Sequence, residues 1–107
     1  MKRKYYINTR VAGVQYNEAI FCVEELKNGK KLKLVREEDN KFDPNAIAIY
    51  CDECKIGYIP SDENEELAIF LDQGWGNIFE VYICQYNPEQ HPEKQIAINI
   101  YVRKNEK

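Results

Sequence analysis

Hydrophobic and polar residues alternate with a period of two along much of the chain, which is typical of strands with one buried face. The last such segment is the clearest: Ile96, Ile98, Ile100 and Val102 alternate with Ala97, Asn99 and Tyr101. In the first, Tyr5 and Ile7 are expected to share one face. Strands are predicted at residues 5–11, 30–37, 46–50, 55–60, 77–86 and 95–102.

One segment has the apolar spacing of an α-helix. Hydrophobic residues at positions 67, 68, 70 and 71 form a stripe at steps of three and four, and Gly74 follows where a helix would end. Ser61 is the expected N-cap, because it precedes acidic residues that the helix dipole favours in a first turn. A helix is therefore predicted from Ser61 to about Asp72.

Residues 17–27 have a less regular pattern, with apolar residues at spacings nearer three and four than two. Asn17 is a candidate cap, and both a short helix and an irregular strand remain open for this segment. The whole pattern predicts a mainly β fold with one or two short helices. The strand number favours a six-stranded, modified OB-like β-barrel that is partly closed.

Length and composition predict one domain. The chain has 107 residues, of which 44% are apolar, so residues 1–107 are expected to form a single domain with one modest core. Its apolar runs, such as Ile20 to Val23, are far too short to span a membrane, and no signal peptide is recognised. A cytoplasmic location with four reduced cysteines is expected.

The formal charge of −3 argues weakly against binding driven by phosphate attraction. Its distribution is uneven: residues 1–36 hold nine Lys and Arg against three Glu, whereas residues 37–72 hold two Lys against eleven Asp and Glu. The basic third of the chain could face phosphates, but solvated surfaces also explain the asymmetry.

The polar loop between the strands at 30–37 and 46–50 has a specific chemistry. Side chains of Asn40, Asp43 and Asn45 can bond to nearby backbone amides, and Pro44 forces Asp43 into an extended conformation. We expect these restraints to hold the Asp43 carboxylate and the Phe42 ring at a rigid loop tip. Turn formation alone is the alternative explanation for these residue types.

No catalytic constellation is apparent, and no cofactor or small-molecule substrate is expected. Cys51 and Cys54 have the spacing of half a zinc site, but the remaining ligands would have to come from scattered positions, so free thiols are the expectation and zinc the alternative. His91 is the only histidine and no nucleophile is paired with it, so the protein is not expected to be an enzyme.

Aromatic residues suggest a different activity. The chain has eight Tyr, and several rings lie at expected strand ends, where exposed rings can stack on the bases of single-stranded nucleic acid. A position that caps the barrel core is the alternative for each ring, and it is the stronger one for Tyr58. The rings are Tyr16, Phe42, Tyr58 and Tyr86.

Three motifs, at residues 13–16, 32–47 and 56–60, together resemble the HIRAN domain in order and spacing. They read Gly-Val-Gln-Tyr, Leu-x-Leu-Val-Arg-Glu-x-x-Asn-x-Phe-Asp-Pro-Asn-Ala-Ile and Ile-Gly-Tyr-Ile-Pro. The resemblance covers about residues 8 to 86. HIRAN domains occur in fork-remodelling DNA translocases and as small stand-alone bacterial or phage proteins, and this chain resembles the stand-alone form.

The resemblance implies an OB-like barrel that captures the 3′ end of single-stranded DNA, in DNA repair or at replication forks. Carried over, Tyr16 and Phe42 would stack on the terminal bases and Asp43 would accept a hydrogen bond from the 3′-hydroxyl. Asn40 and the backbone near Gln15 would assist.

This chain departs from the eukaryotic pattern at three positions of the implied site. Gln15 stands where that pattern has a basic residue, Tyr58 where it has a histidine, and Ser61 near the place of a lysine. Loss of these charges favours the alternative function, a protein-interaction module that docks onto a DNA-processing enzyme without binding DNA. Lysines at 30, 31, 33 and 41 are candidates for compensation.

Overall fold

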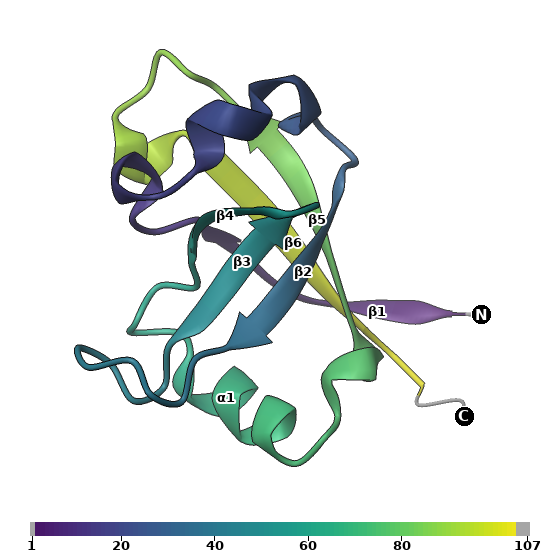
Figure 1. Cartoon of the computed structure of the whole chain (residues 1–107). Coiled ribbons are helices and arrows are strands. Elements are labelled where there is room, and N and C mark those ends of the chain that lie inside the picture. The colour runs from purple at the N-terminus through teal and green to yellow at the C-terminus, as the bar shows by residue number, and fades with distance from the viewer. Residues whose placement is uncertain (1, 105–107) are drawn as a thin grey trace.

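Six strands form one antiparallel sheet in the computed structural model, which describes residues 2–104 (Figure 1). The order across the sheet is β1-β6-β5-β2-β3-β4. The alternating segments of the sequence therefore become strands, and the predicted mainly β, six-stranded OB-like fold is confirmed. The strands are β1 (Arg3–Arg10), β2 (Lys31–Arg36), β3 (Ile47–Cys51), β4 (Cys54–Tyr58), β5 (Phe79–Tyr86) and β6 (Ile96–Arg103).

The sheet curls into a barrel that is only partly closed. Between β2 and β5 the ladder is short, with the pairs Lys31↔Tyr82 and Leu32↔Val81. On the other side a single bridge joins the chain just beyond β1 to the end of β4: Ala12 N donates to Tyr58 O at 2.8 Å, and Tyr58 N donates to Ala12 O at 2.9 Å. This bridge holds the Ala12–Tyr16 segment against the barrel wall.

The core lies inside the curled sheet, and isoleucine is its most frequent residue. Branched side chains such as isoleucine pack well on the pleated inner surface of a sheet, and the isoleucines of this core are wholly buried. The helix α1 (Glu65–Asp72) covers one open end with Leu67 and Ala68, which are also buried (Figure 1). The buried isoleucines are Ile47, Ile49, Ile56, Ile59, Ile83, Ile96, Ile98 and Ile100.

A bulge in β1 contradicts the prediction that Tyr5 and Ile7 share a face. Tyr5 pairs with Tyr101 and Ile7 pairs with Ile100, so Tyr6 is an extra residue in the ladder. The inserted residue reverses the alternation, leaving Tyr5 60% exposed while Ile7 packs against the core. Period-two reasoning fails at such a point because it assumes an uninterrupted register.

The helix begins later than its sequence predicted. Ser61 is not the N-cap: residues 60–63 form a turn in which Glu63 N donates to Pro60 O at 2.9 Å, and Asn64 occupies the N-cap position of α1. Pro60 sets that turn and delays the helix by three residues. No helix in the described part of the chain is long and apolar enough to cross a membrane.

Within residues 17–27 the segment Ala19–Glu25 forms a short 3₁₀ helix, so of the two options left open by the sequence the short helix is confirmed. Asn17 is not a cap here, because its side chain donates to Gly13 O at 2.7 Å and the helix begins after Glu18. Cys22 has non-helical backbone angles that kink the segment. The short 3₁₀ helices are η1 (Val14–Tyr16), η2 (Ala19–Glu25), η3 (Gly76–Ile78) and η4 (Pro92–Lys94).

Candidate nucleic-acid interface

A pocket of about 320 Å³ opens where the β2–β3 loop meets the end of β4. It is bounded by loop residues on one side and by the bridged backbone of Ala12 and Tyr58 on the other. Five of the seven residues singled out from the sequence line it, although they are up to 21 positions apart. The lining is Ala12, Asn40, Phe42, Asp43, Ala46, Tyr58, Ile59 and Ser61.

The β2–β3 loop is held by its own side chains. Asn40 Oδ1 accepts hydrogen bonds from Phe42 N at 2.8 Å and Asp43 N at 3.0 Å, and Asp43 Oδ1 accepts one from Asn45 N at 2.9 Å. These bonds use the Asn and Asp side chains in place of a backbone ladder. The loop thus presents Phe42 with 96% of its surface exposed, on a backbone with little freedom.

The Asp43 carboxylate is also tied to the helix. Asn64 Nδ2 donates to Asp43 Oδ2 at 2.8 Å, and Asn64 is 1% exposed. This bond explains why Asn64, although at the N-cap position, makes no side-chain bond to its own helix. Asn64 was missed from the sequence because its contact spans 21 residues and no local pattern marks it.

Tyr58 reaches the pocket from β4 as part of a charged network. Its hydroxyl donates to Glu37 Oε1 at 2.8 Å, and Lys55 Nζ donates to Glu37 Oε2 at 2.9 Å and to Tyr58 Oη at 3.0 Å. Asn40 Nδ2 donates to the same carboxylate at 3.1 Å. Glu37 therefore couples the loop to the barrel wall, and Lys55 is held by a carboxylate that lowers its availability to a phosphate.

The electrostatics of this network give a pH dependence. Burial raises the pKa of Glu37, but hydrogen bonds from Lys55, Tyr58 and Asn40 outweigh it and hold that pKa below its ordinary value of 4.5. The same pairing, first through its hydrogen bond to Glu37, raises the pKa of Lys55. Because the folded-state pKa of Glu37 is depressed, its contribution to stability is complete above the unfolded-state pKa and is lost as pH falls through the folded-state value.

Glu37→Gln is accordingly expected to flatten the fall in melting temperature between pH of about 5 and 3. Melting curves across that range, recorded by circular dichroism, measure it. Glu38→Gln is the matched control, because Glu38 is exposed and should leave the profile unchanged. Equal flattening by both variants would contradict the role given to Glu37.

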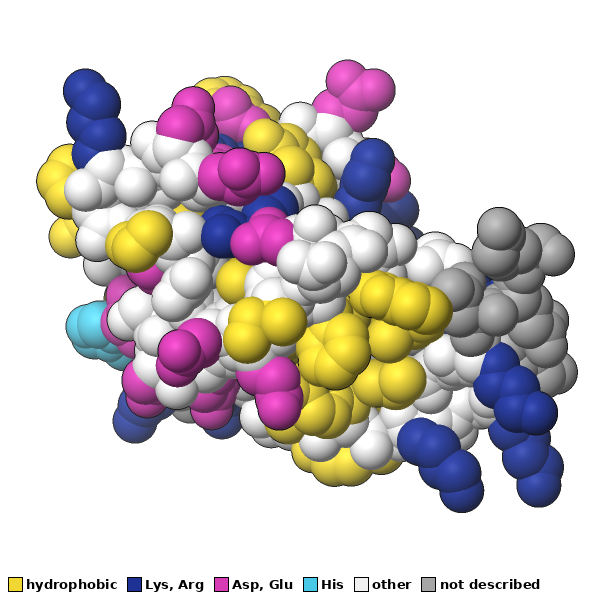
Figure 2. Space-filling view, turned by 90° about the horizontal axis from the view of Figure 1, so that it is seen from below, with side chains coloured by type: hydrophobic (Ala, Val, Ile, Leu, Met, Phe, Trp, Pro, Cys, Tyr) yellow, Lys and Arg dark blue, Asp and Glu magenta, His cyan; other side chains and the backbone are white. Residues whose placement is uncertain are grey.

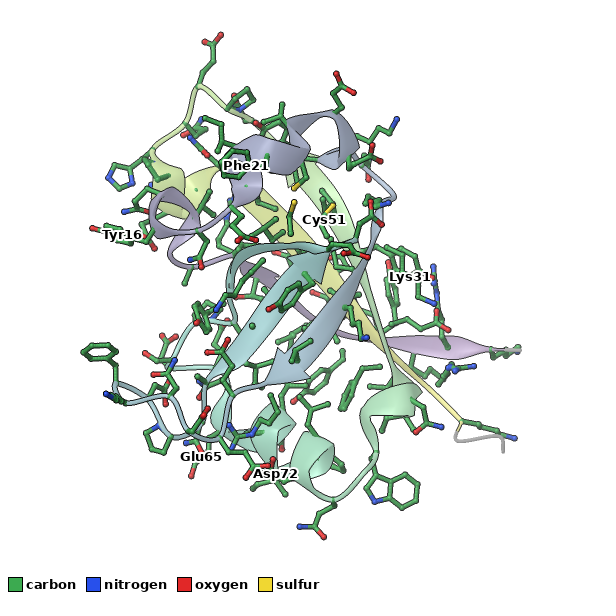
Figure 3. All side chains as sticks on the ribbon, in the orientation of Figure 1. Tyr16, Phe21, Lys31, Cys51, Glu65 and Asp72 are labelled. Atoms are coloured by element: carbon green, nitrogen blue, oxygen red, sulfur yellow. The ribbon has the colours of Figure 1, made fainter. Side chains whose placement is uncertain are left out.

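Tyr16 and Gln15 lie on η1, which follows a turn at Gly13. Gly13 has φ of 73°, a conformation that glycine adopts without strain. Tyr16 is 83% exposed, and it projects to the same side of the view as the β2–β3 loop (Figures 1 and 3). Gln15 instead lines a separate hollow of about 340 Å³, together with Tyr86, which packs against the core.

The lysines considered as replacements for missing charge are mostly remote from this pocket. Lys30, Lys31 and Lys33 line another one, of about 650 Å³, beside Leu71 and Phe79. Lys30 is further engaged by Asp52, at 3.0 Å. Lys41 is different, because it is exposed and lies within the β2–β3 loop next to Phe42.

Among the described residues, the structure does not bring together the zinc ligands that the sequence left as an alternative. Cys51 and Cys54 are free thiols at the β3–β4 turn. Burial raises the pKa of both Cys51 and the nearby Cys22, so these thiols are held protonated. Across residues 2–104 no group of His, Cys, Asp and Glu has the arrangement of a metal site. His91 Nδ1 accepts a hydrogen bond from Glu93 N at 3.2 Å and starts η4.

Comparison with known proteins supports the resemblance stated from the motifs. The family model of the HIRAN domain matches residues 4–105. A crystal structure of a protein from Lactobacillus plantarum aligns with a TM-score of 0.79 at 22% identity, covering 94% of this chain and 95% of that one. The crystal structure of the HIRAN domain of human HLTF aligns with a TM-score of 0.68 at 15% identity, covering 94% and 78%. The comparison with curated protein sequences found no match.

Proposed function

Because this chain belongs to the HIRAN domain family, known as a nucleic-acid-binding module, we propose that it binds single-stranded DNA at a free 3′ end. The proposed module is non-enzymatic and acts in the cytoplasm, in DNA repair or at replication forks. Its partners are DNA ends and, through them, DNA-processing enzymes. The observation that carries the proposal is the Asp43 carboxylate, fixed on a pocket wall beside the exposed Phe42 ring.

The chemistry of end recognition follows from that carboxylate. Asp43 accepts one hydrogen bond on each oxygen, from Asn45 N and from Asn64 Nδ2. A carboxylate has about four acceptor positions, so others remain for a hydroxyl donor in the pocket. The negative charge repels a phosphate at the same position. The pocket would thus accept a strand that ends in a hydroxyl and reject one that ends in a phosphate.

Affinity in this proposal comes mainly from stacking. Phe42 and Tyr16 offer two rings with 96% and 83% of their surfaces exposed, and each stacked base contributes about 1–3 kcal/mol. The phosphate contribution is small, because Lys55 is bound to Glu37 and only Lys41 among the lysines considered lies in the loop. If binding includes one phosphate contact, raising the salt concentration from 50 to 200 mM should weaken it only about threefold.

Fluorescence anisotropy with a short labelled single strand tests the proposal. A strand with a free 3′-hydroxyl is compared with one carrying a 3′-phosphate, each at low and moderate salt. We expect the hydroxyl strand to bind about tenfold more tightly at both salt concentrations, since a lost charged hydrogen bond costs about 1.5–3 kcal/mol. Equal binding of the two strands would refute end recognition, and no binding to either would refute the function.

Phe42→Ala should weaken DNA binding about tenfold or more through the lost stacking of one base. The melting temperature should not change, because the ring is 96% exposed and supports no packing. Phe21→Ala is the matched control: that ring is 80% exposed but lies on η2, outside the pocket. DNA binding that falls equally in both variants would mean that the effect is not specific to the β2–β3 loop.

A further inference from the structure

The helix η2 exposes a run of large hydrophobic side chains. A 3₁₀ helix has three residues per turn, so burial of Ala19 and Cys22 commits one face to the core. The intervening apolar residues must then point outward: Ile20 is 74% exposed, Phe21 80% and Val23 45%. We call these three residues the η2 ridge. The fold itself does not need them, because the buried face already anchors the helix.

Hollows flank the η2 ridge on both sides. One, of about 340 Å³, lies between Ile20 and Val23 and the residues Tyr86, Pro88 and Pro92. Its apolar walls suit the insertion of a hydrophobic side chain. The other, of about 710 Å³, lies between the ridge and the β3–β4 turn. A ridge between two hollows is a shape that an interdigitating partner can fill.

The second hollow carries strong negative charge. Four carboxylates line it, from Glu24, Glu25, Asp52 and Glu53. Lys30 offsets part of this charge, since its Nζ lies 3.0 Å from Asp52 Oδ1 and 3.7 Å from Glu25 Oε1. Among the described residues, Glu24 and Glu53 form no ion pair. The η2 ridge is therefore bordered on one side by two carboxylates, Glu24 and Glu53, that have no ion-pair partner among the described residues.

We infer that the η2 ridge is a docking surface for a basic amphipathic helix of a partner protein. Hydrophobic residues on one face of that helix pack over Ile20, Phe21 and Val23, and its lysines or arginines lie over Glu24 and Glu53. The occupant follows from charge complementarity, because apolar contact alone does not choose a partner. A helix presents both properties at once, with apolar anchors at intervals of three and four residues and charges on the neighbouring face.

Charge also argues against other occupants of this surface. Nucleic acid and anionic membranes are polyanions, which the carboxylates of Glu24 and Glu53 repel because Lys30 does not pair with them. The site is distinct from the pocket at the β2–β3 loop: η2 and that loop lie at opposite ends of the molecule as Figure 1 presents it, and Figure 3 shows Phe21 at the η2 end. This inference stands independently of the proposed DNA binding, and both ligands could be held together.

The test uses the whole chain and three labelled peptides of 16 residues, followed by fluorescence anisotropy. One is an amphipathic helix of Leu and Lys, one replaces every Lys by Glu, and one scrambles the Leu/Lys order. We expect the ordered basic peptide to bind about tenfold more tightly than either control peptide. Phe21→Ser combined with Ile20→Ser should remove that preference, and Glu24→Lys combined with Glu53→Lys should reverse it toward the acidic peptide.

A matched control lies on the opposite face. Ile69 lies on α1 and is 57% exposed. Figure 2, which views the molecule from the side of α1 in Figure 1, shows hydrophobic side chains gathered on that face. Ile69→Ser should leave peptide binding unchanged, as should Phe42→Ala. Equal binding of the scrambled peptide, or equal loss in Ile69→Ser, would overturn the inference. Self-association that Phe21→Ser abolishes, seen by sedimentation, would also overturn it, because the occupant would then be a second copy of this chain.

Discussion

Asp43→Ala is expected to abolish the preference for a 3′-hydroxyl over a 3′-phosphate. The hydroxyl strand loses a charged acceptor, which weakens its binding by about 1.5–3 kcal/mol, or about tenfold to a hundredfold. The phosphate strand loses a repulsive neighbour, so its binding stays the same or improves. The two affinities should converge in anisotropy titrations. Equal weakening for both strands would mean that Asp43 contributes only to the shape of the loop.

Asn64→Ala separates these two roles. Asp43→Ala also deprives Asn45 N and the buried Asn64 amide of their acceptor. Asn64→Ala removes the same contact to Asp43 but leaves the carboxylate in the pocket. We expect this variant to melt at a lower temperature, because Asn64 is 1% exposed, and yet to retain the preference for the hydroxyl strand. Loss of the preference in Asn64→Ala would assign end selection to loop geometry.

Gly57→Ala is expected to destabilise the fold by on the order of 3 kcal/mol. A Cβ at this position would lie 2.4 Å from Ala12 O and 2.4 Å from Val11 Cγ1, and the first of these is backbone that cannot rotate away. The contact adjoins the Ala12–Tyr58 bridge, so relief requires the bridge to open. Thermal unfolding followed by circular dichroism should show a fall of about 12 °C or more in melting temperature.

Gly29→Ala provides the comparison for that substitution. Gly29 has φ of +93° but no heavy atom within 4 Å of an added Cβ, so alanine there costs only backbone strain. That strain is about 1–2 kcal/mol, below the expected loss at Gly57. Similar losses at both positions would show that close approach of β4 to Ala12 is not what requires glycine. Because Ala12 and Tyr58 line the pocket, Gly57→Ala should also weaken DNA binding.

Alternation in the sequence was sufficient to locate the strands, because a strand with one buried face places an apolar residue at every second position. It failed at Tyr6, where a bulge adds a residue and moves Tyr5 to the outside. The capping pattern likewise placed the N-cap of α1 at Ser61 instead of Asn64, because capping preferences are local and the turn set by Pro60 competes with them. Such errors fall at element ends and irregularities.

The sequence also indicated the local chemistry of the β2–β3 loop. Bonds from Asn40 to Phe42 N and from Asp43 to Asn45 N span two residues each, so their geometry is encoded by neighbouring residue types. The exposure of Phe42 and Tyr16 was anticipated for the same reason, since both lie beyond the ends of strands.

Only the tertiary structure decided what surrounds that loop. The bridge between Ala12 and Tyr58 brings both residues to it. The buried Asn64, 21 residues along the chain, orients Asp43, and Glu37 pairs with Lys55 at 2.9 Å. The tertiary structure also decided which apolar residues of η2 face outward, because the sequence left the conformation of residues 17–27 open. Contacts between distant residues depend on how the strands pack around the core. Local patterns in a single sequence do not specify that packing, so these contacts could not be predicted.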